Sequence, residues 1–220
     1  MTHDITVIGA GGFGQETLDV IEAIEGERQG TYRLLGVVDD APSAHARASL
    51  QARGVEWLGS VDDWLARAPQ TSFIVSIGSP VVRARLAHQL EAQGLLAVTV
   101  VHPRATIGTR SSIGAGSVIC AGAQISTGVT LGRNVHVNPN GTIGHDACLA
   151  DNVSINPGAV ISGFVSIEDR VLVGAGAVVL QGLTIGRDSV VGAAGCVTRD
   201  VAPGITVVGI PAREYESSTT

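Results

Sequence analysis

The sequence predicts an α/β unit with a small Rossmann-like parallel sheet, followed by an all-β unit that forms a parallel β-helix. Two observations predict this fold class. Strand patterns alternate with helix patterns over about the first hundred residues, as they do in parallel sheets with helical crossovers. From Ile107 to Val197 an aliphatic residue then occupies every sixth position without a break. The domains are predicted to be 1–101 and 102–220, because Pro103 lacks the amide hydrogen that continued sheet pairing needs.

The first domain is expected to contain four strands with helices between them. The first helix begins after Gly14 and carries an apolar face. The second begins at Ser60 with a shortened capping box, and the third begins near Val82 and ends at Gly94. The strands are the apolar runs at residues 5–8, 34–38, 73–77 and 95–101.

The six-residue period defines the second domain. A helix would repeat every 3.6 residues and a strand every second residue, so neither explains the pattern. Fixed-period self-similarity is typical of a solenoid, here the hexapeptide class of parallel β-helix. After Val197 the pattern ends, and the polar tail at 216–220 is expected to be disordered. The sixteen aliphatic positions are Ile107, Ile113, Ile119, Ile125, Leu131, Val137, Ile143, Leu149, Ile155, Ile161, Ile167, Val173, Val179, Ile185, Val191 and Val197.

The composition excludes several classes of partner. The 220 residues are 45% hydrophobic and 3% aromatic, with 29 glycines, as a narrow aliphatic solenoid with tight corners requires. The net charge of −6 argues against nucleic acid and against an acidic membrane surface. No apolar run approaches the roughly 20 residues of a membrane span, so we expect a soluble, cytoplasmic protein. No metal is expected, since ligand spacing is absent and the small, partly buried cysteines lie far apart, at Cys120, Cys148 and Cys196.

Residues 9–14 form a glycine loop between the first strand and the first helix, and they fit the pattern G-x-G-x-x-G. Backbone amides at a helix N-terminus favour phosphate, and an acidic residue after the second strand, Asp39 or Asp40, suits ribose or base hydroxyls. Alone the loop indicates NAD, but the motif is weak, and a tight turn without a ligand also produces it. The domain is too small for two nucleotide halves, so one nucleotide diphosphate fits better. The loop residues expected to contact it are Gly11, Gly12, Phe13 and Gly14.

Four segments carry a resemblance to a known family: 9–16, 36–40, 138–162 and 209–213. Over nearly its full length the chain resembles the sugar acetyltransferases of the NeuD, PglD and PerB types, which join a small Rossmann-like domain to a left-handed β-helix. The resemblance implies acetyl-CoA as co-substrate, no metal, and a homotrimer with active sites at the subunit interfaces. It also implies that the glycine loop and the acidic pair hold the nucleotide of the acceptor.

His145-Asp146 is the candidate for the chemistry. Acyl transfer from a thioester needs a base for the proton of the attacking group, and an imidazole beside a carboxylate suits that task. The family has His followed by an acidic residue here, which implies that His145 is the base and that Asp146 orients it. The resemblance also implies three hexads per coil, so that positions eighteen apart stack about 4.8 Å from one another. Gly163, eighteen residues after His145, matches the family's oxyanion-stabilising glycine, and Asn138 matches an Asn near the acyl or acceptor site.

The resemblance also assigns the acetyl-CoA contacts, with two departures. Ser154 stands where some relatives carry a second His near the thioester. His136, one coil earlier, either takes that place in part or is an ordinary exposed corner residue. Gln15 stands where relatives often have a basic residue facing the phosphates. The residues implied for acetyl-CoA binding are Ser154, Gly163, Ala175, Ala193, Pro211 and Arg213.

Three functions fit these features. The first is acetyl-CoA-dependent N-acetylation of a small-molecule substrate, a nucleotide-linked 4-amino-deoxy sugar. The second is O-acetylation of sialic acid or another polysaccharide sugar by the same residues, and the third is a non-catalytic scaffold that binds sugar nucleotides. The sequence leaves open the sugar, the nucleotide, the acetylated atom and the acyl chain length. Because no loop interrupts the repeats, we expect a neighbouring subunit and the N-terminal domain to close the site.

Overall fold

The structure is a computed structural model of the chain, and it describes residues 2–215. These residues form two compact units. The first contains the residues up to Pro103 together with Ala115–Val118, and the second contains Arg104–Gly114 and the residues from Ile119 onward. The boundary expected between residues 101 and 102 stays a prediction. The disorder expected for 216–220 concerns residues outside the described part.

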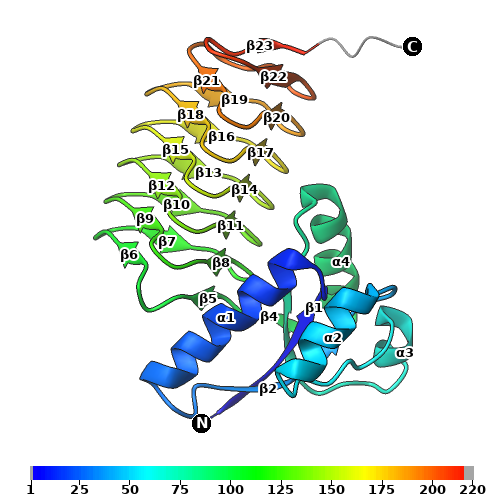
Figure 1. Cartoon of the computed structure of the whole chain (residues 1–220). Coiled ribbons are helices and arrows are strands. Elements are labelled where there is room, and N and C mark those ends of the chain that lie inside the picture. Colours follow the sequence, from blue (N-terminus) through cyan, green and yellow to red (C-terminus); the bar gives the residue numbers. More distant parts are fainter. Residues whose placement is uncertain (1, 216–220) are drawn as a thin grey trace, which may run out of the picture. The chain divides into compact units, whose positions relative to one another are not determined.

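The first unit contains a parallel four-stranded sheet with the strand order β2-β1-β3-β4 (Figure 1). Residues such as Ile5, Val7 and Phe73 are fully buried, because both faces of the sheet are covered. This confirms the predicted Rossmann-like sheet. The strands are β1 (His3–Ile8), β2 (Tyr32–Val38), β3 (Ser72–Val75) and β4 (Leu96–Ala97).

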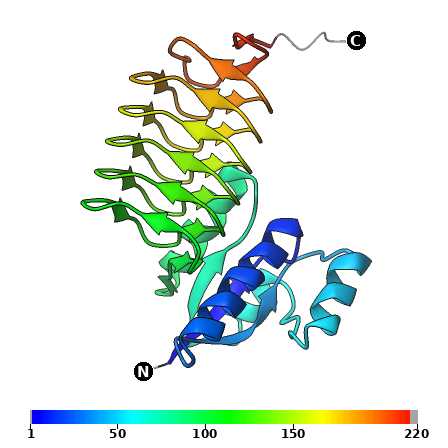
Figure 2. The same cartoon turned by 60° about the vertical axis from the view of Figure 1, so that its left-hand side comes forward.

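Helices cover the two faces of this sheet (Figure 2). On one face lies α1 (Gly12–Glu27), whose Leu18 and Ile21 are buried as the sequence predicts. On the other face α3 (Val61–Leu65) and α4 (Pro80–Ala92) share a core cluster with the inward side chains of β1, β2 and β3. Ser60 caps α3, since its hydroxyl accepts a hydrogen bond from the Asp63 amide at 3.2 Å. Among the described residues, no helix is both long enough and apolar enough to cross a membrane.

One helix of the first unit is not predicted by the sequence pattern. This helix is α2 (Ala44–Ala52), and only its residues Ala46 and Leu50 are buried. Its sequence therefore lacks a broad apolar stripe. Its start is nevertheless encoded locally, because the Ser43 hydroxyl accepts from the Ala46 amide at 3.1 Å.

The single strand predicted at residues 95–101 is wrong. The structure has two short strands instead, β4 and β5 (Val100–Val101). Pairing with β3 ends where the Val98 amide donates to the Phe73 carbonyl at 2.9 Å, and the Val100 amide donates instead to the Ser117 carbonyl at 3.0 Å. One apolar run thus changes its pairing partner, which hydrophobic periodicity does not reveal.

The second unit is a parallel β-helix whose coils stack on one another (Figures 1 and 2). One sheet has the order β19-β16-β13-β10-β7, a second has β21-β18-β15-β12-β9-β6, and a third includes β8, β11, β14, β17, β20, β22 and β23. The strands are β6 (Thr106–Ile107), β7 (Ser112–Ile113), β8 (Val118–Ile119), β9 (Gln124–Ile125), β10 (Thr130–Leu131), β11 (His136–Val137), β12 (Thr142–Ile143), β13 (Cys148–Leu149), β14 (Ser154–Ile155), β15 (Val160–Ile161), β16 (Ser166–Ile167), β17 (Leu172–Val173), β18 (Val178–Val179), β19 (Thr184–Ile185), β20 (Val190–Val191), β21 (Cys196–Val197), β22 (Thr206–Val208) and β23 (Arg213–Glu214).

Neighbouring coils from β6 to β21 pair residues eighteen positions apart, as the resemblance implies, whereas β22 pairs with β20 at a separation of sixteen. Thr142 pairs with Val160, and each later coil repeats this register. From 119 to 197 every aliphatic position of the period is buried, whereas Ile107 is 37% exposed because β6 lies at the end of its sheet. Cys148 is exposed, contrary to expectation, because it precedes the inward-facing Leu149 in its strand and so faces out.

The coils turn at corners where one residue has a positive φ. Glycine adopts this left-handed conformation without steric cost, and Asn and Asp tolerate it better than other residues. The non-glycine residues in this conformation within the solenoid are Arg110, Asn134, Asn140, Asp146, Asn152, Phe164, Arg170, Asp188 and Ala194.

Arg83 of α4 is a charged side chain that is completely buried. Its Nη1 donates to the Ile77 carbonyl at 2.8 Å, which holds the segment after β3. Burial lowers the pKa of Arg83 to about 9, so the guanidinium remains charged at neutral pH. The segment that it holds supports the glycine loop, since a Cβ on Gly9 would lie 2.9 Å from the Ser76 carbonyl oxygen.

We expect Arg83→Ala to lower the free energy of unfolding by about 3 kcal/mol, because the Ile77 carbonyl loses a donor and a cavity opens in the core. Arg85→Ala, on the exposed side of the same helix, is the control and should change it by less than about 0.5 kcal/mol. Urea denaturation followed by circular dichroism measures both variants. Equal losses would contradict a stabilising role for the buried guanidinium.

Candidate active site

His145 and Asp146 lie at a solenoid corner directly after β12. Nδ1 of His145 is 2.9 Å from Oδ2 of Asp146, and the two side chains are 52% and 41% exposed. Asp146 makes this contact from a left-handed backbone with φ of 58°. A carboxylate at Nδ1 favours the tautomer with hydrogen on that atom, which leaves Nε2 as the acceptor. The predicted pair is therefore in contact, and Nε2 is the atom that can take a proton.

Gly163 lies one coil after His145, where the stacking rule places it. A Cβ at this position would be 2.7 Å from Nε2 of His145, so any side chain here would displace the imidazole. Gly163 is not among the described residues with positive φ, so proximity to the ring and not backbone conformation requires glycine. Its amide hydrogen has no acceptor within residues 2–215.

Two residues that the sequence analysis did not single out complete this corner. Gly128, one coil before Asp146, leaves room for the carboxylate, because a Cβ there would lie 2.6 Å from Oδ1 of Asp146. Phe164, one coil after Asp146, sets its ring perpendicular to that of His145, with centroids 5.0 Å apart. The period of eighteen contains the signal for both positions, but it does not tell which of the stacked corners matter.

A groove of about 490 Å³ lies along β6, β9 and β12 and reaches His145. Strand residues Thr106, Gln124 and Thr142 line it together with the corner residues Gly108 and Thr127. The groove provides room for a substrate next to the imidazole. Within the described part of the chain, no group of three or more His, Cys, Asp or Glu side chains is placed to hold a metal ion.

Asn138 is buried and bonded to the next coil. Its Nδ2 donates to Oδ1 of Asn156 at 3.0 Å. Its own Oδ1 is buried and has no hydrogen-bond partner among the described residues, so it is an acceptor that a water molecule or a substrate group would satisfy. Asn138 does not line the groove at His145, and its predicted role at the acceptor stays a prediction.

His136 and Ser154 are paired between β11 and β14, as stacking by eighteen predicts. His136 is 1% exposed and Ser154 is 2% exposed. The interpretation of His136 as an exposed corner residue is therefore wrong, because the residue lies within a strand. A part for either side chain at the thioester stays a prediction.

The remaining residues implied for acetyl-CoA binding are exposed and lie toward the C-terminal end of the solenoid. Ala175 and Ala193 occupy equivalent places in neighbouring coils, and the Ala194 amide donates to the Ala175 carbonyl at 2.8 Å. Arg213 lines a second cavity of about 380 Å³, which Pro211 does not line. This cavity does not include His145, so the structure does not gather the predicted acetyl-CoA residues into one cavity.

The glycine loop of the first unit has two kinds of glycine. Gly14 is required by packing, because a Cβ there would lie 2.1 Å from the Gly9 carbonyl oxygen. Gly11 and Gly12 face open space, since a Cβ on either residue would have no atom within 4 Å, and Gly11 caps the 16-residue helix α1. The loop therefore leaves an accessible surface at a helix N-terminus, which suits a phosphate group.

The acidic pair after β2 makes backbone contacts that the sequence does not reveal. Asp39 accepts from the Ala10 amide at 2.7 Å and from the Ala41 amide at 2.9 Å. Asp40 accepts from the Val61 amide at 2.9 Å, at the start of α3. Asp39 thus joins the glycine loop to the end of β2, and Asp40 caps a helix. Their predicted contacts with a nucleotide stay predictions.

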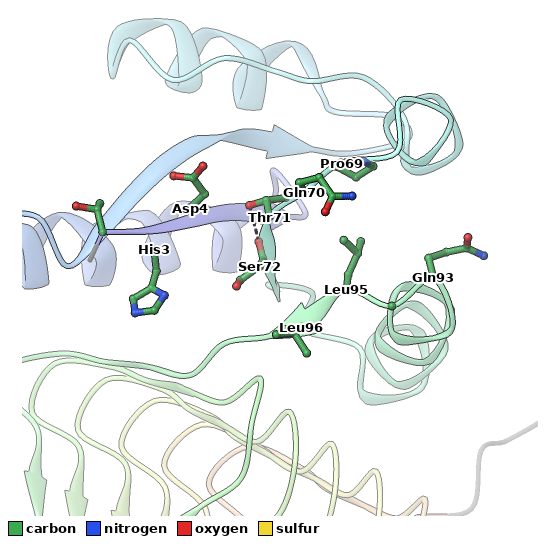
Figure 3. A pocket seen from close by; sticks show the side chains of 11 residues that line it. His3, Asp4, Pro69, Gln70, Thr71, Ser72, Gln93, Leu95 and Leu96 are labelled. Atoms are coloured by element: carbon green, nitrogen blue, oxygen red, sulfur yellow. Dashed lines mark hydrogen bonds between the residues drawn. The ribbon is translucent and has the colours of Figure 1, made fainter.

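A third hollow, of about 440 Å³, opens where β1 and β3 begin (Figure 3). His3, Asp4, Ser72 and Leu96 are among its lining residues, and Asp4 forms an ion pair with the exposed Arg33. The glycine loop follows the opposite end of β1, so this hollow is separate from the predicted nucleotide site.

Two known families match the chain, one in the part that contains the glycine loop and one in the part with the six-residue repeat. Residues 4–90 match the family described as the PglD N-terminal domain. Residues 104–145 and 164–199 match the family described as the hexapeptide repeat of succinyl-transferase. No curated protein shows significant sequence similarity to the chain. The resemblance stated from the sequence is confirmed by these matches and by the solved structures.

Three solved structures are similar over nearly the whole chain. A mutant of perosamine N-acetyltransferase from Caulobacter crescentus, in complex with CoA and GDP-perosamine, has a TM-score of 0.87 and 26% identity, covering 99% of both chains. The acetyltransferase domain of PglB from Neisseria gonorrhoeae has a TM-score of 0.85 and 29% identity, covering 97% of this chain and 100% of that one. WeeI from Acinetobacter baumannii has a TM-score of 0.83 and 28% identity, covering 97% and 100%. These likenesses confirm the predicted fold class, a Rossmann-like domain followed by a left-handed β-helix.

Gly128→Ala should lower the rate of acyl transfer at least about tenfold, because the added methyl group pushes the Asp146 carboxylate away from His145. Gly204→Ala is the matched control: it has the same backbone conformation, with φ of 73° against 72°, but nothing within 4 Å of the new methyl group. Both variants carry the left-handed strain of roughly 1–2 kcal/mol. Release of CoA and thermal denaturation are measured for both. If the two lose activity equally, strain and not the Asp146 contact is responsible.

Proposed function

We propose that this chain, an acyltransferase that joins a PglD-type N-terminal domain to hexapeptide repeats, transfers the acetyl group of acetyl-CoA to the amino group of a nucleotide-linked deoxyamino sugar. One observation carries the proposal: the His145 imidazole is held between Asp146 at Nδ1 and the Gly163 backbone near Nε2, beside an open groove. The similar enzyme from Caulobacter crescentus was solved with CoA and GDP-perosamine, which supports this substrate class.

His145 acts as the general base in this proposal. Nε2 accepts a proton from the acceptor amine while the amine nitrogen attacks the thioester carbon. The Gly163 amide hydrogen donates to the oxyanion that develops on the thioester oxygen. Collapse of this intermediate breaks the carbon–sulfur bond, and the proton held at Nε2 passes to the departing thiolate. Asp146 keeps the imidazole in the required tautomer and orientation.

The glycine loop binds the nucleotide part of the acceptor in this proposal. Gly11 and Gly12 expose backbone at the start of α1, where the helix dipole favours a diphosphate. The sheet has four parallel strands and lacks a second nucleotide-binding half, which favours a single nucleotide over NAD. Asp39 holds the loop through the Ala10 amide.

The assembly proposed for the active protein is a homotrimer in the cytoplasm, with sites shared between subunits. The solenoid exposes Val160, Phe164 and Leu180 at 36%, 64% and 37%, and contact with another chain would cover such side chains. Light scattering coupled to gel filtration tests the assembly. A monomer at the concentrations used for assay would contradict it.

His145→Ala should reduce acetyl transfer about 100- to 10,000-fold while leaving the melting temperature within a few degrees, because the side chain is half exposed. The assay measures CoA release with acetyl-CoA and a panel of UDP-, GDP- and dTDP-linked 4-amino sugars. His88→Ala, an exposed histidine of α4, is the control and should keep full activity. A product acetyl group that survives mild alkali indicates an amide, whereas one that is lost indicates the ester of an O-acetyltransferase. Failure of wild-type protein to bind acetyl-CoA by calorimetry would favour the non-catalytic scaffold.

Asp39→Ala should raise the KM for the nucleotide sugar about tenfold and leave the KM for acetyl-CoA unchanged, because it frees the Ala10 amide and loosens the glycine loop. Asp62→Ala, on the exposed first turn of α3, is the control for loss of an acidic side chain. Steady-state kinetics with each substrate varied in turn separates the two constants. Equal changes in both constants would contradict a role confined to the nucleotide.

A further inference from the structure

Phe164 combines three properties that are unusual for an aromatic residue. It follows Gly163 at a solenoid corner, and its backbone is left-handed, with φ of 57°. It is the sole aromatic residue with positive φ in the described part of the chain. Its side chain is 64% exposed, so burial of the ring within the chain does not explain why a bulky residue occupies this corner.

The corner column that contains Phe164 shows what the position normally holds. The stacked residues with positive φ are Arg110, Gly128, Asp146, Phe164 and Gly182. Glycine is the residue that this conformation favours, and Asp tolerates it through its short polar side chain. A phenylalanine in this column therefore has an unfavourable backbone conformation, and residues with such conformations are frequent at functional sites.

The backbone and the side chain of Phe164 both contact His145. The Phe164 amide donates to the His145 carbonyl at 2.9 Å, which fixes the spacing of the two coils. The two rings are perpendicular, and their centroids are 5.0 Å apart, an edge-to-face arrangement that aromatic pairs favour. The imidazole is thus bounded by the Asp146 carboxylate at Nδ1, the Gly163 backbone near Nε2 and the Phe164 ring.

We infer that Phe164 is a positioning residue for His145, which keeps the imidazole in the orientation where Nδ1 meets Asp146 and Nε2 remains the free acceptor. This inference rests on the proposed function of His145 as the base. A half-exposed imidazole can otherwise rotate about χ1 and χ2 into solvent, and the single contact with Asp146 does not restrain both torsions. The perpendicular phenyl ring restrains the orientation of the imidazole plane, which the contact with the carboxylate does not fix by itself.

The test compares Phe164→Ala with Phe164→Tyr, which retains the ring, and with Arg110→Ala, an exposed residue of the same column with φ of 60°. Phe164→Ala is expected to lower kcat about tenfold and to leave the KM for acetyl-CoA within twofold. Phe164→Tyr is expected to restore kcat to within twofold of wild type, and Arg110→Ala to leave it unchanged. A wild-type kcat in Phe164→Ala, or failure of the Tyr variant to rescue, would overturn the inference.

A second readout does not depend on turnover. Nitrogen chemical shifts of the His145 ring report which nitrogen carries hydrogen, and the His145→Ala spectrum identifies that ring among the six histidines. Wild-type protein is expected to have hydrogen on Nδ1, and Phe164→Ala to show a mixture of both tautomers. If wild-type protein transfers no acetyl group, the proposed function fails, and the tautomer comparison still decides whether Phe164 positions the ring. An unchanged tautomer in Phe164→Ala would overturn the inference, whether or not the oligomer dissociates.

Discussion

The hydrogen-bonded register between coils is the constraint on which the rest of the solenoid depends. From β6 to β21 a coil contains three six-residue units, and paired strands lie eighteen positions apart. One inserted residue would turn the aliphatic positions of its strand outward, so the register and the core are fixed together. The same register brings Gly128, Asp146 and Phe164 into one column and places Gly163 against His145. The chemistry of the site is therefore set by the stacking that holds the fold together.

Much of the fold follows from sequence periodicity, and the centre of the candidate site follows from the resemblance together with the eighteen-residue coil that it implies. The period predicts the strands of the β-helix, and stacking by eighteen predicts the contact between Gly163 and His145. The period does not predict the contact of Phe164 with His145, because a corner position favours Gly, Asn or Asp. Nothing in the pattern indicates that an aromatic ring at a corner contacts a neighbouring coil. The burial of Arg83 escapes prediction for a related reason. A charged residue is normally assigned to the surface, and only the tertiary fold reveals the Ile77 carbonyl that accepts its hydrogen bond.

The acidic pair after β2 shows that a sequence motif predicts the location of a side chain more reliably than it predicts the partner of its hydrogen bonds. Asp39 and Asp40 both bond to backbone amides, at Ala10 and Val61. A sequence cannot distinguish a carboxylate that accepts from a ligand hydroxyl from one that accepts from the main chain, because both tasks use the same oxygen atoms. Carboxylate oxygens have several acceptor sites, so the contact with Ala10 does not prevent Asp39 from accepting a further hydrogen bond. Its structural task is to shape the loop that a nucleotide would occupy.

Within the described part of the isolated chain, nothing fully covers the proposed base His145 or its partner Asp146. The His145 and Asp146 side chains are 52% and 41% exposed, and water at such a site weakens every electrostatic interaction that would stabilise a developing oxyanion. No loop is extruded from the coils between residues 107 and 197 to cover them. The Phe164 side chain lies beside the imidazole and is 64% exposed, so burial of its apolar surface by another group would be favourable. Bound substrate and a second copy of the chain are the available covers. A second copy of the chain at this corner would exclude water around His145, which supports the proposal of sites shared between subunits, whereas the three-fold assembly itself is implied by the resemblance alone.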